Sequence, residues 1–527
     1  MAACLDEEPK DQLTEDEAFA NASSLYINTV ATLYNYLGGN ADSQGLQGTY
    51  RGVYDYCTFT TDEAMLPTRG GDWYDGGFWQ SLYRHEWTAD DGALYDTWNY
   101  LYKVVVLCNR SLARLDSHAS LLAASTLAAY KAEVRAIRAL FYYYLMDLYG
   151  RVPLVVSDEV PIHEVRQSSR SEIFRFVVSE LQETAPLLAD VRSNEEGPYY
   201  GRVTRPVAWF LLAKLSLNAA VYTDDDWTDG VPVDGRRVSL TVGGTSMNAY
   251  EAAIAYCDLL AEGGYELSED YADNFSVHNE NSPENIFTIP MDKLQFSNMF
   301  LYLFRSRHYN HGSALGMDAE NGACATLHAV RTFGYGTSEV DSRYAVCFFS
   351  DTVHVDGSVV TLDNGQPLVY RPLDVQLDLT GTPYEKTAGA RMAKYEIDRT
   401  AHADGKLQSN DIVLFRYADV LLMKGEALFR NGADGAAFVN AVRTRAGMAP
   451  LAIDGSNWRT LLLDERLREL MWEGWRRQDM VRFGCFHQAY DQRQPLADEG
   501  SGYTTVFPIP QTVIDLNHNL TQNGGYK

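Results

Sequence analysis

The chain has 527 residues, of which 46% are hydrophobic and 12% aromatic, which is too apolar for a disordered protein. It carries 44 basic and 71 acidic side chains, giving a formal net charge of −27. A chain this acidic lacks the excess lysine and arginine that displaces counterions from nucleic acid, and it gains little from anionic lipid surfaces. We therefore expect a folded protein that binds neither nucleic acid nor a bare lipid surface.

Apolar residues repeat at helical spacing along much of the chain. One stripe covers residues 98–112, and a second covers 134–148 and stops at Gly150, which is typical of a helix end. A third helix is expected over 204–219. Residues 411–446 predict a helix–turn–helix unit close in length to a tetratricopeptide repeat.

Two details of the C-terminal half refine this prediction. The apolar stripe of the helix–turn–helix unit begins at Leu414, and Gly425 stands where its two helices would approach closely. A later helix is expected to carry Glu465, Glu469 and Glu473 alternating with arginines beside an apolar stripe. Paired charges next to a core orient helices, so we assign these residues a structural role.

Long irregular stretches separate the helices, at residues 38–92, 224–248 and 273–407, with short strand signals at 285–289 and 359–362. The expected fold class is mainly α: a tetratricopeptide-like helical scaffold with long irregular loops and a few short strands. No proline-rich or polar linker divides the chain. We therefore expect a single domain over residues 4–527, preceded by an added leader at 1–3.

Catalytic motifs are absent from the sequence. It contains no GxSxG, HExxH, GxxxxGK[ST] or strand-linked GxGxxG pattern. His308 and His311 could share a helix face, but no third ligand is identifiable, and residues 224–226 are typical of a solvated acidic turn rather than of a calcium loop. We expect no cofactor, no metal and no enzyme activity, although 71 acidic residues leave a glycosidase pair open.

The seven cysteines contain no closely spaced pair, so the sequence predicts neither a zinc knuckle nor a disulfide framework. Cys4 differs from the others because it is almost N-terminal and a polar segment follows it. Two interpretations are open: an incidental thiol in a loose tail, or a lipidated residue. No apolar stretch reaches the roughly 18 residues that a membrane-spanning helix needs.

The segment 61–87 concentrates aromatic side chains around two glycine pairs. Its aromatic residues are accompanied by charged ones: Trp73, Tyr74, Phe78 and Trp79, with Arg69, Asp72 and Asp75. A sugar offers an apolar face to an aromatic ring and hydroxyls to fixed donors and acceptors, and glycines allow the backbone to hold rings away from the scaffold. The alternative is that these rings fold inward as a small core of the loop itself.

Several segments together resemble the SusD-like (RagB/SusD) family of outer-membrane nutrient-binding lipoproteins of Bacteroidetes. Cys4–Pro9 resembles the mature lipoprotein start, Glu133–Leu154 the helix ending in LYGxVPL, and Pro283–Phe287 the ENIF strand. Arg416–Leu428 is similar to the family's RyADvLLmkAEAl helix, with Gly425 where alanine is usual. The closing segment, 522–526, has glycine at 524 where proline is usual.

The resemblance implies a tetratricopeptide-like scaffold, variable loops that bear the ligand site, and Cys4 as the lipid attachment. It implies that the protein binds oligosaccharide at the cell surface and delivers it to a TonB-dependent, SusC-like outer-membrane transporter. The candidate ligand-binding residues are Trp73, Trp79, Tyr74, Asp72 and Arg69, with Asp42, Tyr302 and Tyr309 as weaker candidates. A peptide ligand, a scaffold that binds only protein, and a helical glycan-degrading enzyme remain as alternatives.

Overall fold

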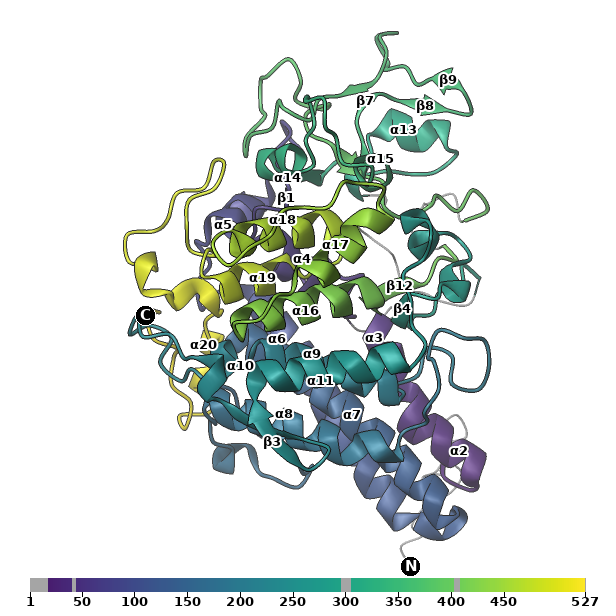
Figure 1. Ribbon diagram of the computed structural model, residues 1–527, viewed down its shortest axis with the longest axis vertical. Coiled ribbons are helices and arrows are strands. Elements are labelled where there is room, and N and C mark those ends of the chain that lie inside the picture. The colour runs from purple at the N-terminus through teal and green to yellow at the C-terminus, as the bar shows by residue number, and fades with distance from the viewer. Residues whose placement is uncertain (1–17, 40–43, 295–304, 402–407, 527) are drawn as a thin grey trace, which may run out of the picture.

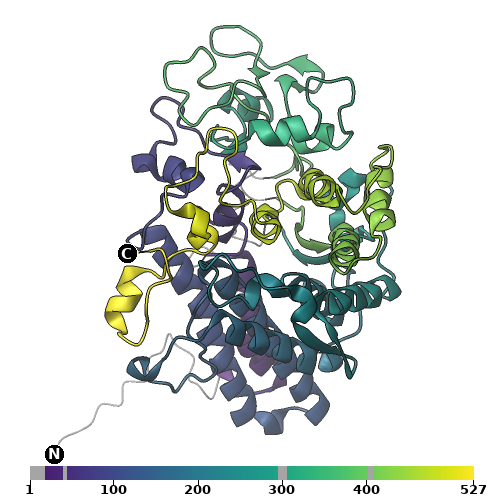
Figure 2. The same cartoon turned by 60° about the vertical axis from the view of Figure 1, so that its left-hand side comes forward.

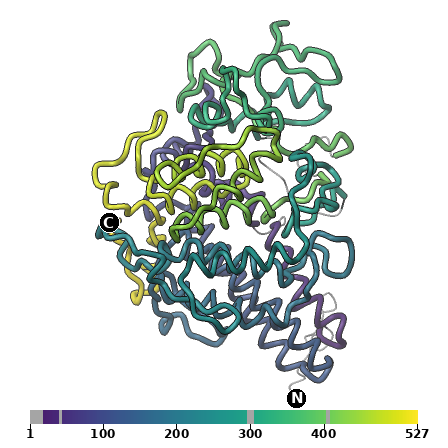
Figure 3. The backbone as a smooth tube through the Cα atoms, in the orientation of Figure 1, coloured from purple at the N-terminus to yellow at the C-terminus, as the bar shows by residue number. Residues whose placement is uncertain are grey.

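The computed structural model describes residues 18–39, 44–294, 305–401 and 408–526. Helices occupy the lower and middle parts of Figure 1, and the segment from α13 to β9 lies at the upper end. The same division is visible after rotation in Figure 2, and the backbone tube in Figure 3 follows it. The structure is thus a helical scaffold with an irregular layer at one end.

The first part of the scaffold consists of long helices that pack in sequence. They are α6 Gly92–Ser117, α7 Ala124–Tyr149, α8 Arg170–Thr184, α9 Arg205–Leu217 and α11 Ala249–Glu262. Helix α6 packs on α7, α7 on α8, and α9 on α11. The helices expected over 98–112, 134–148 and 204–219 are confirmed, and α7 ends at Gly150, where φ is +69°.

The second part contains α16 Tyr417–Arg430, α17 Ala436–Arg445, α18 Trp458–Leu470 and α19 Arg476–Phe483. Gly425 lies at the contact between α16 and α17, because a Cβ there would be 3.0 Å from Val439 Cγ2. The prediction for Leu414 is wrong. This residue belongs to strand β12 Ile412–Arg416, which pairs antiparallel with β4 Asn285–Ile289. All five residues of β12 are buried, and a short apolar run does not distinguish a buried strand from a helix.

The helix that carries the glutamates also differs from expectation. It is interrupted between α18 and α19, where Trp472 has φ +68° and Gly474 has φ +76°. Glu469 accepts hydrogen bonds from Arg343 at 2.7 Å, Arg416 at 2.5 Å and Arg445. Its partners therefore come from other segments rather than from arginines of its own helix.

These charges form a buried ion network between the irregular layer and the scaffold. Lys394 of the 273–407 excursion donates to Glu473 at 2.5 Å, and Arg343 of the same excursion reaches Glu465 at 2.7 Å. Burial alone would raise the pKa of Glu469, but the guanidinium groups around it hold that pKa below its usual range. The glutamates thus join the 273–407 excursion to the helical scaffold, which is a structural role, as the sequence predicts.

Short elements make up the excursions. The helices are α2 Ala22–Tyr26, α3 Thr32–Gly38, α4 Val53–Thr58, α5 Phe78–Arg84, α10 Ala219–Tyr222, α13 Tyr309–Ala314, α14 Leu327–Thr332, α15 Tyr344–Cys347 and α20 Gln511–Leu516. The strands form antiparallel pairs: β1 Ala64–Met65 with β5 Cys324–Ala325, β2 Ser239–Val242 with β3 Thr245–Asn248, β11 Arg391–Met392 with β6 Phe348–Phe349, β10 Val369–Tyr370 with β7 Asp351–Thr352, and β8 His354–Val355 with β9 Ser358–Val359.

The strand expected over 359–362 begins one residue earlier and ends at Val359. Pairing of β1 with β5 joins the 38–92 excursion to the 273–407 excursion. The fold is mainly α with short strands, as the sequence predicts. Within the part of the chain that the structure describes, no helix has the length and apolarity needed to cross a membrane.

Candidate functional site

The loop after β1 turns tightly around Tyr74. Trp73 and Asp75, on either side of it, have φ values of +62° and +45°, and Gly76 and Gly77 have φ values of +69° and +88°. Glycine adopts this left-handed region without the steric cost that a side chain incurs. The Tyr74 side chain is left 56% exposed. The turn therefore holds one aromatic ring in solvent.

Trp73 is half-buried, and its contacts fix its orientation. Its indole nitrogen donates to the Glu320 carbonyl at 2.9 Å, and its ring packs so closely on Gly322 that a Cβ there would lie 2.6 Å from Trp73 Cε2. The Trp79 ring meets Trp73 edge-on, with the centroids 6.2 Å apart. Only part of the Trp73 ring is thus open to a ligand.

Trp79 and Arg69 lie inside the protein. Trp79 is 2% exposed and donates from its indole nitrogen to Asp75 Oδ2 at 2.7 Å. Arg69 is fully buried and donates to the carbonyl oxygens of Gly322, Glu385 and Ala388. Because both side chains are buried, neither can make the direct contact with a ligand that the sequence predicts for it. The inward-folding alternative applies to Trp79, and both side chains position the loop.

Asp72 joins the loop to two segments that are distant in sequence. Its Oδ2 accepts from the Tyr309 hydroxyl at 2.8 Å and from Lys386 Nζ at 2.7 Å. The hydrogen bond from Lys386 lowers the pKa of Asp72, and burial, aided by the bond to Asp72, raises the pKa of Tyr309 to about 12. Tyr309 stays 43% exposed, so it offers a second ring near the loop.

Sequence reasoning missed several neighbours of these residues. Tyr50 lies 6.4 Å from Trp73 between ring centroids, and its hydroxyl donates to the Glu320 carboxylate. Arg51 lies over the Phe78 ring at 4.6 Å and pairs with Asp75 at 3.1 Å. Tyr50 and Arg51 fall inside the predicted 38–92 excursion, but no local pattern sets them apart from its other polar and aromatic residues.

We call this connected set the aromatic surface. Its rings and the polar groups around them are Tyr50, Trp73, Tyr74, Phe78 and Tyr309, with Arg51, Asp72, Asp75, Glu320 and Lys386. Partly exposed rings beside fixed donors and acceptors match a ligand that has both apolar faces and hydroxyl groups. Asp72 is held as the anion, whereas a general acid for glycoside cleavage needs a raised pKa.

The remaining candidate residues lie outside the described part of the chain, and the two histidines serve local structure. Cys4, Asp42 and Tyr302 lie outside the described residues. His308 caps α13 by accepting from the Asn310 backbone at 3.1 Å, and His311 Nδ1 bonds to the Tyr370 hydroxyl at 3.1 Å, so both rings serve local structure.

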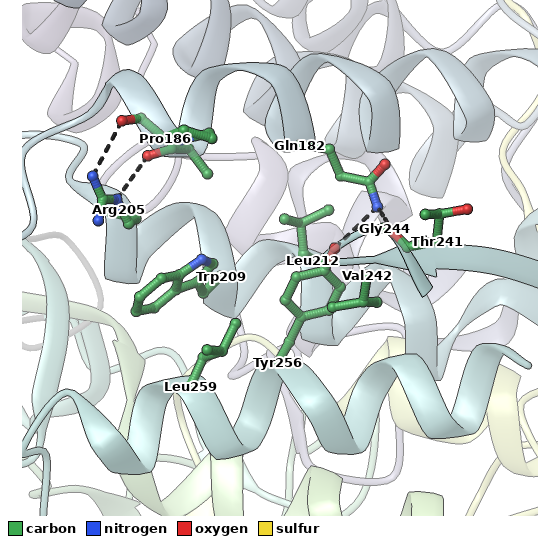
Figure 4. Close-up of a pocket in the computed structure, with 12 residues that line it drawn as sticks. Gln182, Pro186, Arg205, Trp209, Leu212, Thr241, Val242, Gly244, Tyr256 and Leu259 are labelled. Carbon is green, nitrogen blue, oxygen red and sulfur yellow. Dashed lines mark hydrogen bonds between the residues drawn. The ribbon is translucent and has the colours of Figure 1, made fainter. Parts of the chain in front are cut away.

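A hollow of about 500 Å³ lies elsewhere, between α8, α9, α11 and the β2–β3 hairpin (Figure 4). Its walls are mainly apolar, with Trp209, Leu212 and Leu259 lining it. Gln182 donates to Tyr256 and Thr241 in this wall, and Arg205 donates to nearby carbonyl oxygens. Because the walls of this hollow are mainly apolar, the aromatic surface offers the better match to a polar ligand.

A helical scaffold with a polar and aromatic surface on its loops defines a binding protein of the helical-repeat class. Two family models match the chain: "SusD family" over residues 377–526 and "Starch-binding associating with outer membrane" over residues 5–217. The chain belongs to the SusD-like family.

Related proteins support this assignment. The chain is 25% identical to the starch-binding protein SusD of Bacteroides thetaiotaomicron over 432 residues, covering 75% of this chain and 73% of that protein. It is 24% identical to the SusD-like protein P25 of Formosa agariphila over 478 residues, covering 82% and 80%.

Solved structures share the fold. A laminarin-binding SusD-like protein superposes with a TM-score of 0.72 at 19% identity, covering 96% of this chain and 100% of that one. Surface glycan-binding protein A from Bacteroides thetaiotaomicron, in complex with laminarihexaose, gives a TM-score of 0.71 at 19% identity, covering 95% and 99%. At this level of identity the likeness concerns the fold alone.

Proposed function

We propose that this protein is a non-catalytic glycan-binding protein that captures oligosaccharide on the aromatic surface. The observation that carries the proposal is the pairing of exposed rings with fixed polar groups: Tyr74 and Tyr309 are 56% and 43% exposed, and Asp72 and Lys386 are bonded beside them. Stacking against a sugar face and hydrogen bonding to its hydroxyls need this combination. The starch-binding relative and the laminarihexaose complex of a protein with this fold agree with the same ligand class.

The expected affinity is modest. Two rings that contribute about 2 kcal/mol each give about −4 kcal/mol, which corresponds to a dissociation constant of roughly 1 mM. Weak binding suits a protein that releases its ligand to a transporter. Transfer to a TonB-dependent, SusC-like partner and anchoring of Cys4 to the outer membrane are parts of the proposal that rest on family membership.

A panel of ligands tests the proposal against its alternatives. Purified protein is titrated calorimetrically with starch oligosaccharides, laminarin oligosaccharides and a mixed peptide pool, and each sugar incubation is assayed for new reducing ends. We expect heat of binding with a glycan and no reducing sugar. Binding of peptide alone would favour a peptide-binding protein, the absence of all binding would favour a protein-interaction scaffold, and released sugar would identify an enzyme.

A further inference from the structure

A second hollow, of about 480 Å³, lies on the helical scaffold and shares no lining residue with the aromatic surface. Its wall is built from the start of α8, from α10 and the turn after it, from the end of α19 and from residues 500–505, with single residues of α11, α16 and α18. Four arginines line it, and we call it the arginine pocket: Arg170, Arg430, Arg459 and Arg482. Such a concentration of positive charge is unexpected in a chain of net charge −27.

Arg170 is the distinctive residue of the arginine pocket. Its guanidinium carbon lies 5.2 Å from the centroid of the Tyr222 ring and 5.6 Å from that of a Trp227 ring, and the residue is 1% exposed. No hydrogen bond or ion pair reaches its guanidinium from any residue that the structure describes, and Nε is buried. A buried charge is costly unless it is paired, so the donors of Arg170 are suited to an anion from outside the chain.

Two more polar atoms in the same wall lack partners. Trp227 Nε1 and His487 Nδ1 are buried, and neither has a hydrogen-bond partner within the described ranges of the chain. Both residues line the arginine pocket together with Arg170. An indole nitrogen can only donate, and an imidazole nitrogen donates in one tautomer or when the ring is protonated. Three potential donors from separate segments thus border one cavity.

Of the four lining arginines, two are paired with acidic side chains of the described residues and the other two are not. Arg430 and Arg482 are both bonded to Glu426, whereas Arg459 donates to the Phe483 carbonyl and forms no ion pair with a residue that the structure describes. Asp224 is the carboxylate that lines the cavity, and it accepts from the Asp226 backbone at 3.1 Å. Arg170 and Arg459 therefore face a single acidic residue of the lining. The Asp147 carboxylate, whose charge also acts on Arg170, is bonded to Arg477 at 2.7 Å.

The lining also includes apolar and aromatic side chains, among them Val231, Pro232 and Phe486, beside the hydroxyls of Ser501 and Thr505. A bare inorganic ion would leave these walls in contact with water, whereas an organic acid would cover them and present its oxyanion to Arg170. We propose that the arginine pocket binds the carboxylate of a small organic acid, with Arg170 as its main partner and Trp227 and His487 as further donors. The site does not depend on the proposed glycan function.

Calorimetry with small acids tests this site. The probes are glucuronate and N-acetylphenylalanine, which carry the carboxylate on a sugar and on an aromatic body, and glucose and N-acetylphenylalanine amide are their neutral counterparts. We expect at least one acid to bind while its neutral counterpart does not, and whichever acid binds identifies the source of the carboxylate. Failure of both acids to bind, equal binding of a neutral counterpart, or equally tight binding of sulfate would overturn the proposal.

Variants locate the binding in the cavity. Arg170→Met keeps the length of the side chain and removes its charge, and it should weaken binding by roughly 10- to 100-fold, the range for a hydrogen bond to a charged group. The matched control is Arg175→Met, since Arg175 is an exposed arginine on the same helix and its loss changes the net charge equally. Equal effects of both substitutions, or no effect of Arg170→Met, would contradict the assignment.

A milder variant covers the case in which Arg170→Met fails to fold. Trp227→Phe keeps an aromatic ring beside Arg170 and removes the unpartnered N–H, so its binding should fall by about two- to tenfold. Unchanged binding in that variant would remove Trp227 from the site and contradict the three-donor arrangement. Tyr74→Ala, on the aromatic surface, should leave acid binding unchanged, so failure of the glycan proposal and failure of this one can be told apart.

Discussion

Replacing Gly322 with alanine should disturb the aromatic surface without touching any exposed side chain. The added Cβ would lie 2.6 Å from Trp73 Cε2, 2.7 Å from Cζ2 and 2.9 Å from Leu66 Cδ2. Carbon atoms in van der Waals contact are about 3.5–4.0 Å apart, so the indole must move by about 1 Å. That shift would strain the 2.9 Å bond from the Trp73 indole to the Glu320 carbonyl.

The expected cost has two parts. Overpacking a closely packed site typically destabilises a protein by about 1–3 kcal/mol, and displacement of Trp73 should weaken glycan binding several-fold. Urea unfolding followed by tryptophan fluorescence measures the first part, and calorimetry measures the second. Gly71→Ala is the control because it lies in the same loop and a Cβ there would meet no atom within 4 Å. Wild-type stability and affinity in Gly322→Ala would refute the inferred packing.

Three further predictions concern the buried network, the pH dependence and the anchor. Arg416→Met should destabilise the fold by about 3–5 kcal/mol in urea unfolding, because it leaves buried Glu469 short of a partner; the exposed Arg399→Met should cost less than about 1 kcal/mol. Burial lowers the pKa of His85 from 6.5 to about 4, so the unfolded state takes up a proton that the folded state excludes. Stability should therefore fall between pH 6.5 and 4, by on the order of 3 kcal/mol, and His85→Gln should flatten that part of the profile. Cys4→Ala in the native precursor should leave the protein out of the membrane fraction, and outer-membrane recovery of that variant would refute the anchor.

The sequence predicts the scaffold well because its helices bury long stripes with a 3.6-residue period. Helix α7 and its end at Gly150 follow from that pattern alone. The apolar pattern places Leu414 in a helix because every residue of β12 is buried, so this strand lacks the alternation that marks a half-exposed strand. At the break after α18, the apolar residues continue through Met471 and Trp472, so the stripe predicts a continuous helix, whereas Gly474 is typical of a helix end.

The sequence predicts the loop that carries the candidate site but not which of its side chains face solvent. Clustering of aromatics identified the loop, but whether a ring faces solvent depends on tertiary contacts. Trp79 turns inward toward Phe59 and Arg305, whereas Tyr74, a few residues away, does not. Lys386 comes from the other long excursion, and no local spacing connects it with Asp72. The arginine pocket likewise gathers residues from seven separate segments between Arg170 and Thr505.

Calorimetric titration of the double variant Tyr74→Ala, Tyr309→Ala with the glycan that wild-type protein binds tests the central claim most directly. Loss of a ring that contributes about 2 kcal/mol lowers the affinity roughly 30-fold, so binding by the double variant should fall below detection. Tyr199→Ala, which removes a 37% exposed tyrosine on the scaffold, should bind as wild type does. Unchanged affinity in the double variant, with its circular dichroism spectrum intact, would contradict the assignment of glycan binding to the aromatic surface.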